Sequence, residues 1–515
     1  MGKIRKPADF YFREHHQARN IGRKSVRAYL FTAGANGLKF FINIATVSIL
    51  ARLLVPEDFG YVAMAAAFVS TPKIVAGQHL AMGVVQARTI SVRQLNTFFW
   101  LSATITLAIA AAAWLGSPLV AWFFDEPRLT GITRVMSTMV LFAGLSAVHR
   151  SLLARTMQFG VISGIDLAAR IISKITAVVL AVTGMGYWAL VFMPVSYESA
   201  RMALLWMFCS FTPGFGGADG DSSEGGRSLI RIGSVWSGNS VLTSLVSELD
   251  RIVIGKFLSS QALGFYSRAF SLGEMPGKFI AWPLAGISIS ALSRLQDNRE
   301  KYRRFFFILT EGYLFAFVPV LMLLFLSSEN IVLLVLGEKW RDAVPIFRGL
   351  IPFFLMKNMS RPVRWFLAST CDTQRLLRKI TVKSVINNTA FAIGVFAGLY
   401  WGITGVVVSL ALSSLVSFFI SVFYVFHGEI ITPGAFMRVV WRPLFACGAT
   451  LFLSSLVPFE AWLGTSGHLV LILARSLLGI LVYMACVLML PGGKKRLVDV
   501  MMSVREILKT KKQGR

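Results

Sequence analysis

Several charged side chains lie inside long apolar segments of this sequence, and most of them are basic. Asp166, Arg170 and Lys174 follow one another at intervals of four residues, so a helix would present all three on one face. Lys39 stands alone near the middle of another apolar segment. Basic side chains gathered in this way suit an anionic ligand.

A second, mainly basic set lies further along the chain. Lys357, Arg361 and Arg364 are separated by four and then three residues, and offsets of four and seven return to nearly the same side of a helix. Lys278 lies one turn beyond Glu274. Arg364 is near the end of its segment, so it could instead snorkel to a membrane interface.

Two interpretations of these charges are open. A charged side chain at the centre of a membrane-spanning helix costs about 2.5–3.5 kcal/mol, so it ordinarily faces a partner or a water-filled cavity. Pairs such as Asp166 with Arg170, or Glu274 with Lys278, would hold helices together. Lys39 has no such neighbour in its segment, which favours the cavity.

Acidic and basic residues also meet in two smaller clusters, Glu248 with Asp250 and Arg251, and Glu198 with Arg201. Either cluster could bind a coupling cation or form a gate, and so could the carboxylates of Asp166 and Glu274. A structural salt bridge is the favoured interpretation. Neither cluster is compact enough to identify a cation site, and the four cysteines are scattered without the spacing of metal ligands.

The composition indicates which elements must hold these residues. Of the 515 residues, 55% are hydrophobic and 15% are charged, and the mean hydropathy is +0.65. These values are typical of a polytopic membrane protein, because a soluble core could not bury so much apolar surface. The formal net charge of +27 does not indicate a nucleic-acid partner, because Lys and Arg lie in short connections and tails.

Apolar segments of spanning length predict an all-α protein with about fourteen transmembrane helices. Barrel strands are excluded because the apolar runs are too long and do not alternate. The expected spans are 29–50, 60–83, 96–123, 131–155, 161–183, 186–210, 228–254, 264–293, 305–327, 343–369, 380–399, 402–426, 438–457 and 466–490.

The distribution of Lys and Arg predicts that both termini are cytoplasmic, because basic residues concentrate in alternate connections and in the tails. An even number of helices agrees with this orientation. The basic residues of the opposite, outer connections are few: Arg52, Arg128, Lys256, Lys339 and Arg341.

An internal repeat relates two parts of the chain. A shift of 204 residues aligns "ARLLVPEDFGYVA" (51–63) with "GKFLSSQALGFYS" (255–267) without a gap and pairs Gly60 with Gly264. Each stretch is expected at the outer end of the first helix of a six-helix block. The repeat therefore predicts two six-helix lobes in parallel orientation, as in some two-lobed transporters.

These blocks define the expected organisation of the chain. The segments are a basic cytoplasmic tail (1–28), an N-lobe (29–210), a flexible cytoplasmic linker (211–227), a C-lobe (228–426), two further helices (427–490) and a basic amphipathic cytoplasmic tail (491–515). The linker glycines do not form a phosphate-binding loop, because the GKS or GKT ending is absent.

The segment "LKFFINIATVSILARLLVPEDFGYVAMAAAFV" (38–69) resembles the N-terminal region of bacterial polysaccharide-transport proteins. The stretch "DRIVIGKFLSSQALGFYSRAF" (250–270) is similar to the corresponding part of their second lobe. These proteins form a Wzx/WzxC-like family of flippases for lipid-linked oligosaccharides, within the superfamily of multidrug extruders and the lipid II flippase. The resemblance covers most of the chain.

This resemblance implies a V-shaped cavity that opens alternately to each side of the bacterial inner membrane. The cargo would be an undecaprenyl-diphosphate-linked oligosaccharide, moved from the cytoplasmic to the periplasmic leaflet without covalent chemistry or a cofactor. Transport could be coupled to a Na⁺ or H⁺ gradient or to the membrane potential, and a polysaccharide polymerase and export machinery would be partners. The cations expected to attract the diphosphate are Lys39, Arg170, Lys174, Lys278, Lys357, Arg361 and Arg364.

Arg52 and Lys256 occupy equivalent repeat positions at the expected outer mouth. They could contact the cargo on its release. Capping of their helix C-termini, which contributes about 0.3–1 kcal/mol, is the favoured interpretation.

Three alternatives to such a flippase are open. A lipid II flippase is the nearest, and a multidrug antiporter fits less well because a basic cavity suits an anionic lipid better than a cationic drug. A membrane glycan ligase or polymerase is the weakest, because the longest outer connection (328–342) is short and mostly apolar and the sequence has no nucleophile motif.

Overall fold

A computed structural model describes residues 21–74, 84, 91–214, 243–370, 373–457 and 468–490. Every regular element in these ranges is a helix, which confirms the predicted all-α class. The chain divides into two compact units, Met1–Gly264 (unit 1) and Phe265–Arg515 (unit 2).

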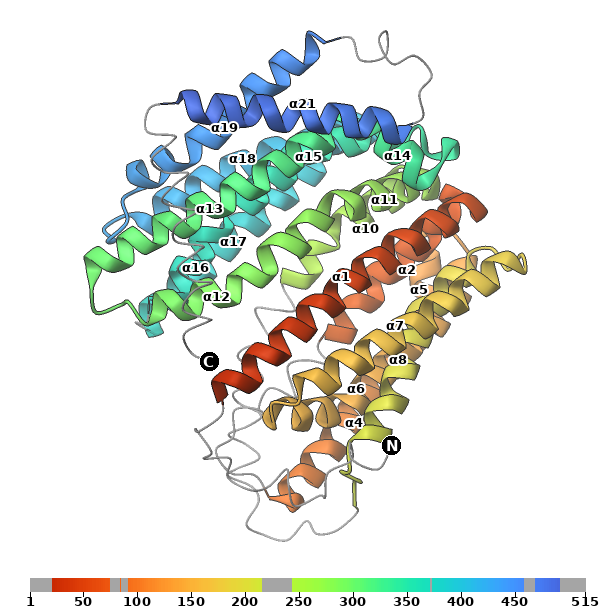
Figure 1. Cartoon of the computed structure of the whole chain (residues 1–515). Coiled ribbons are helices and arrows are strands. Elements are labelled where there is room, and N and C mark those ends of the chain that lie inside the picture. Colours follow the sequence, from red (N-terminus) through yellow and green to blue (C-terminus); the bar gives the residue numbers. More distant parts are fainter. Residues whose placement is uncertain are drawn as a thin grey trace. The chain divides into compact units, whose positions relative to one another are not determined.

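Unit 1 is built around α6, which packs against α2, α4, α5, α7 and α8, while α1 packs on α7. Figure 1 shows these helices in red to yellow. The helices of unit 1 are α1 (Ile21–Leu53), α2 (Pro56–Ile74), α4 (Val92–Leu115), α5 (Ser117–Phe124), α6 (Arg128–Arg155), α7 (Phe159–Val182), α8 (Trp188–Phe208), α10 (Leu249–Phe257) and the first part of α11 (Ser260–Pro276).

Local chemistry determines several helix ends in unit 1. The Ser91 hydroxyl accepts a hydrogen bond from the Gln94 N–H at 3.1 Å, and the Gln94 side chain accepts one from the Ser91 N–H at 3.0 Å, so α4 begins with a capping box. Gly116 separates α4 from α5, and the single span predicted over 96–123 is therefore two helices. Pro56 begins α2, and the chain bends by 120° between α1 and α2.

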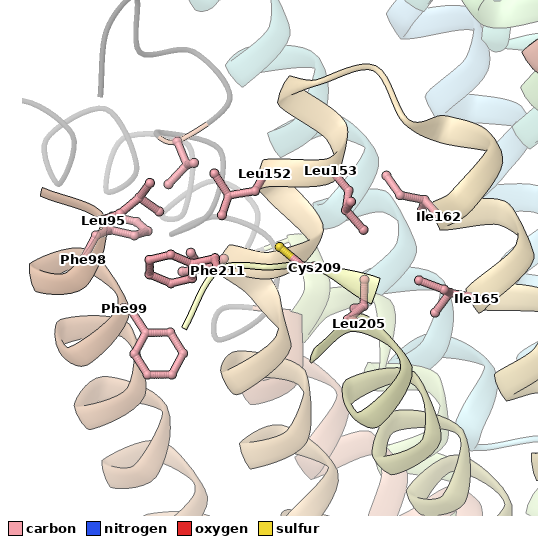
Figure 2. Packing of buried hydrophobic residues seen from close by; sticks show 12 residues of the cluster. Leu95, Phe98, Phe99, Leu152, Leu153, Ile162, Ile165, Leu205, Cys209 and Phe211 are labelled. Carbon is pink, nitrogen blue, oxygen red and sulfur yellow. The ribbon is translucent and has the colours of Figure 1, made fainter. Parts of the chain in front are cut away.

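A buried apolar cluster joins four helices of unit 1 (Figure 2). It includes Phe99 from α4, Leu152 from α6, Ile165 from α7 and Leu205 from α8, all at most 4% exposed. Between helices in lipid, such clusters stabilise mainly through close van der Waals packing. The cluster thereby fixes α7, the helix that carries the polar stripe beginning at Asp166.

The two segments paired by the sequence repeat meet within unit 1. A Cβ atom added at Gly60 would overlap the backbone carbonyl group of Ser260, and one added at Gly264 would overlap the backbone carbonyl group of Pro56. Pro56 and Ser260 are themselves 204 residues apart, so the contact is reciprocal. Glycine at both positions is what allows the backbones to approach so closely. We call this pair of contacts the corner contact.

Further interactions hold α10 against its neighbours. A Cβ at Gly255 would lie 3.0 Å from side-chain atoms of Met64 and Phe124, and the hydroxyl groups of Thr71 and Ser244 are hydrogen-bonded at 3.0 Å. This packing places α10 in unit 1, whereas the repeat assigns it to the second lobe. The expected lobe boundaries stay a prediction.

Unit 2 is also entirely helical in its described part. In it α18 packs against α15 and α17, α13 packs against α15 and α19, and α19 packs against α21 (Figure 1). After the remainder of α11, its elements are η4 (Gly277–Ala281), α12 (Trp282–Ser293), α13 (Arg299–Leu326), α14 (Ser328–Leu336), η5 (Glu338–Trp340), α15 (Ala343–Met359), α16 (Arg361–Ser369), α17 (Thr373–Leu399), α18 (Gly402–Phe426), α19 (Pro433–Ser455) and α21 (His468–Met489).

Aromatic rings form the centre of unit 2. Phe306 from α13, Phe366 from α16, Phe426 from α18 and Phe436 from α19 are all 0% exposed, and the contacting pairs have ring centroids between 5.1 and 6.4 Å apart. Edge-on and tilted pairs at these distances each add about 0.5–1.5 kcal/mol to simple packing. This cluster holds α16 in place.

Two spans predicted for unit 2 are interrupted helices. Ser360 separates α15 from α16, and Pro362 lies in the first turn of α16. Proline is tolerated in the first turn of a helix, whereas inside a helix its missing N–H and fixed φ are unfavourable. The span predicted over 264–293 consists of α11 and α12, joined by the π-helical turn η4. Each interruption lies next to a basic residue of the candidate site, Arg361 or Lys278.

Among the described residues, seven helices are long and apolar enough to cross a membrane, and the bent pair of α1 and α2 would make eight if it is one span. The chain is therefore a multi-pass membrane protein, and the count of about fourteen stays a prediction. α1 begins at Ile21, inside the expected N-terminal tail. The first twenty residues, most of the expected linker (215–227) and the C-terminal tail (491–515) lie outside the described residues.

Candidate functional site

The stripe on α7 pairs with the neighbouring helix α6. The Arg150 guanidinium donates to both carboxylate oxygens of Asp166, at 3.2 and 3.3 Å. An arginine on α6 thus provides the partner of Asp166, and a pair of Asp166 with Arg170, one of the two open interpretations, is not among the ion pairs of the described residues. Lys39 on α1 interacts electrostatically with Asp166, Arg170 and Arg150, so the lone lysine and the stripe belong to one cluster.

The two other basic residues of the stripe, Lys174 and Arg170, also contact neutral groups. The Lys174 ammonium donates to the Asn43 side-chain oxygen at 3.4 Å and lies 3.4 Å from the Met193 sulfur. The Arg170 guanidinium lies over the Tyr197 ring, 5.4 Å from its centroid. Lys39, Arg150, Asp166, Arg170 and Lys174 form what we call the α7 cluster, with four cations and one carboxylate.

Glu198 forms a buried charge triad beside this cluster. Its carboxylate lies 2.6 Å from the Lys73 ammonium and 2.7 Å from the Arg201 guanidinium, and its side chain is only 1% exposed. The predicted pair of Glu198 with Arg201 is confirmed. The sequence did not reveal Lys73, which lies on another helix, α2.

The cluster near the start of α10 is also internally paired. Arg251 forms an ion pair with Glu248, and the Arg251 backbone N–H donates to the Asp250 carboxylate at 2.8 Å. Asp250 is 1% exposed. This arrangement agrees with the favoured interpretation of a structural salt bridge.

Arg52 and Lys256 lie in the last turns of α1 and α10, as the repeat predicted. Cations in these positions interact favourably with the helix dipole. Lys256 also forms an ion pair with Asp125 at 2.6 Å. Their role at an outer mouth stays a prediction.

In unit 2, Glu274 is shared by two lysines. Its carboxylate lies 2.7 Å from the Lys278 ammonium and 3.5 Å from the Lys357 ammonium. The expected pair of Glu274 with Lys278 is confirmed. Lys357 also lies between 5.4 and 5.9 Å from the ring centroids of three phenylalanines of α11 and α15, which stabilises the cation further.

The arginines of α16 lie near neutral polar side chains and near each other, and the Glu274 carboxylate interacts electrostatically with Arg361. The Arg361 guanidinium donates to the Asn358 side-chain oxygen at 2.6 Å, and the Tyr313 hydroxyl donates to the Asn358 backbone carbonyl at 3.3 Å. Arg364 is exposed and interacts electrostatically with Arg361 and Tyr313. Neither arginine forms an ion pair with a carboxylate among the residues that the structure describes.

The structure adds one basic residue, Lys383 on α17, that the sequence reading did not single out. It is 5% exposed and interacts electrostatically with Arg364. The signal was present in the sequence, because Lys379, Lys383 and Asn387 recur every four residues. We call Lys357, Arg361, Arg364 and Lys383 the α16 cluster.

The structure therefore divides the predicted basic residues between two clusters, one in each unit. Both are rich in Lys and Arg, lie within apolar helices and are suited to an anion. Within the described ranges, no group of three or more His, Cys, Asp or Glu side chains could hold a metal ion. Whether an ion gradient drives the protein stays a prediction.

Comparisons with known proteins identify relatives. The family described as polysaccharide biosynthesis protein matches residues 49–345. The succinoglycan biosynthesis transport protein ExoT of Rhizobium meliloti (strain 1021) is 24% identical over 350 residues, which are 68% of this chain and 69% of that protein. The lipopolysaccharide biosynthesis protein WzxC of Escherichia coli (strain K12) is 21% identical over 442 residues, which are 84% of this chain and 88% of that protein.

Solved structures show the same fold. The lipid II flippase MurJ in an inward closed conformation has a TM-score of 0.71 at 14% identity, over 89% of this chain and 98% of that one. An inward-facing multidrug resistance transporter of the MATE family has a TM-score of 0.57 at 15% identity, over 79% of this chain and 95% of that one. At these identities, the similarity shows the fold alone.

Proposed function

Because the chain belongs to the polysaccharide biosynthesis protein family, we propose that it is a flippase that moves a polyprenyl-diphosphate-linked oligosaccharide across the bacterial inner membrane. The family match carries this proposal, since it covers residues 49–345, more than half of the chain. Two of the relatives are named for transport or lipopolysaccharide biosynthesis. The fold shared with transporters agrees with a transport protein rather than an enzyme.

The basic clusters support an anionic cargo. The α7 cluster has four cations and one carboxylate, and neither Arg361 nor Arg364 in the α16 cluster forms an ion pair with a carboxylate among the described residues. A diphosphate carries its negative charge on oxygens that guanidinium groups bind bidentately and ammonium groups bind as point charges. A cationic drug would be repelled by the same groups, which makes a multidrug antiporter the weaker alternative.

In the proposed mechanism, the cations hold the diphosphate while the glycan crosses through a hydrated cavity and the polyprenyl chain stays in lipid. The cavity opens first to the cytoplasm and then to the periplasm, with both termini cytoplasmic, and no covalent bond is made or broken. A Na⁺ or H⁺ gradient, or the membrane potential, supplies the energy. A polymerase and export machinery receive the unit after transport.

Deleting the gene should stop the transport step and leave its substrate behind. We expect polyprenyl-diphosphate-linked repeat units to accumulate in the inner leaflet and surface polysaccharide to be lost, measured by mass spectrometry of lipid extracts and by analysis of exported glycan. Accumulated lipid II would identify the lipid II flippase alternative instead. Completed polymer without attachment would indicate a ligase, and unchanged glycan with altered drug sensitivity would indicate an extruder.

Charge reversal should test the two clusters separately. Lys39→Glu in unit 1 and Arg361→Glu in unit 2 are each expected to reduce glycan export about tenfold or more, because losing a charge-assisted hydrogen bond to phosphate costs about 1.5–3 kcal/mol. Export is measured in cells with the variant protein at wild-type abundance. Arg304→Glu is the matched control, since Arg304 is exposed in the first turns of α13. Unchanged export in both cluster variants would refute the cationic binding site.

A further inference from the structure

Lys379, Lys383 and Asn387 form a polar stripe along α17. The residues at the two ends of this stripe have hydrogen-bonding partners in unit 2. The Lys379 ammonium donates to the Glu429 carboxylate at 2.5 Å and to the Val425 backbone carbonyl at 3.0 Å. At the other end, the Asn387 side-chain oxygen accepts hydrogen bonds from two serine hydroxyls of α18, at 2.5 and 3.2 Å. The ends of the stripe are therefore satisfied inside the fold.

Lys383, in the middle of the same stripe, differs from both neighbours. It is 5% exposed, yet it forms no hydrogen bond or ion pair with any residue that the structure describes. Its electrostatic interaction is with another cation, Arg364, on helix α16, which packs against α17. A buried lysine is ordinarily paired with a carboxylate or satisfied by hydrogen bonds.

Neighbouring groups do not neutralise this pair of cations. Arg364 interacts with Arg361 and with the neutral Tyr313, and Arg361 donates to the neutral side chain of Asn358. The carboxylate of Glu274, which interacts with Arg361, already lies between two lysine ammonium groups. The side of the α16 cluster that contains Arg364 and Lys383 therefore has positive charge without a counter-ion in the described chain.

We propose that Arg364 and Lys383 form a subsite that binds an anionic oxygen group, a phosphate or a carboxylate, of the transported lipid-linked glycan. The subsite rests on the proposed function, and it adds Lys383 and a counter-ion role to that site. Arg364 supplies a planar fork of donors, and Lys383 supplies a compact point charge from a second helix. An anion held between them offsets the repulsion between the two cations and the cost of burying Lys383.

Two parts of the cargo could supply this group, the diphosphate of the lipid and an acidic sugar of the glycan. Binding of undecaprenyl diphosphate, which carries no sugar, separates the two sources. The full chain in lipid nanodiscs is titrated with this lipid and with a lipid-linked glycan that ends in glucuronate. Its neutral counterpart, which ends in glucose, is titrated in parallel.

The variants are Lys383→Met and Arg364→Gln, with Lys383→Arg as the matched control that keeps the charge. If the diphosphate is the ligand, both variants should bind undecaprenyl diphosphate at least about tenfold more weakly, equivalent to about 1.4 kcal/mol. If an acidic sugar is the ligand, binding of that lipid is unchanged, and the preference for the glucuronate-ended glycan over the glucose-ended one is lost. Lys383→Arg should retain binding in either case.

Loss of binding in Lys383→Met and Arg364→Gln supports the subsite only if the variants melt at the wild-type temperature. Wild-type affinity for all three probes in both variants overturns the subsite and leaves the proposed function standing. If the wild-type protein binds none of the three lipids, the proposed function fails and the subsite fails with it. A variant that melts earlier is replaced by Lys383→Gln, to which the same criteria apply.

Discussion

A Gly60→Ala variant is expected to unfold more easily than the wild-type protein and to export less glycan. Its new Cβ would overlap backbone atoms of Ser260, and backbone cannot move aside as the end of a flexible side chain can. Overpacking of this kind typically costs about 1–3 kcal/mol. The measurement is the melting temperature of the purified protein in detergent, together with export in cells.

The reciprocal variant Gly264→Ala should have the same effect, because its Cβ would overlap backbone atoms of Pro56. The double variant should cost less than the sum of the two, since separating the corner contact once relieves both overlaps. Gly164→Ala is the control, because a Cβ at Gly164 meets nothing within 4 Å. Additive losses, or variants as stable as this control, would contradict the reciprocal contact.

A Glu198→Gln variant should lose about 3–5 kcal/mol of unfolding free energy. Glu198 is 1% exposed and neutralises Lys73 and Arg201, so the amide would leave two cations without their counter-charge, and removing one partner of a buried pair has a cost of this size. Unfolding of the purified protein by a denaturing detergent, followed by tryptophan fluorescence, measures the loss.

The matched control for this triad is Glu329→Gln. Glu329 pairs with Arg341 at 2.8 Å, but its side chain is 43% exposed, and exposed ion pairs contribute about 0–1 kcal/mol. Equal, small losses in the two variants would show that the triad does not hold unit 1 together. A Glu198→Gln protein of wild-type stability that no longer transports would instead favour the coupling-ion or gate interpretation.

The apolar segments predicted most helices well because length and hydropathy are local properties of the sequence. The span expected at 402–426 coincides with α18. Interruptions were harder to predict: Gly116 and Ser360 divide expected spans, and apolar residues continue on both sides of each break. The sequence carried a signal at both breaks, Pro118 and Pro362, although proline inside a long apolar segment does not always end a helix.

The candidate site was only partly predictable, for a different reason. Residues on one face of one helix could be grouped from their spacing, and the pairs Glu274 with Lys278 and Glu198 with Arg201 are confirmed. The partner of Asp166 is on another helix, and no spacing rule relates Arg150 to it. Such partners depend on which helices pack together, and the sequence of a single helix does not determine that.

The two halves of the corner contact are related by the internal repeat. Gly60 contacts Ser260, and Pro56 contacts Gly264. The repeat shift of 204 positions relates Pro56 to Ser260 and Gly60 to Gly264, so each contact is the counterpart of the other. Two identical subunits related by a twofold axis meet in this way, with residue i against j and j against i. Within one polypeptide, the corner contact therefore has the reciprocal form of an isologous interface.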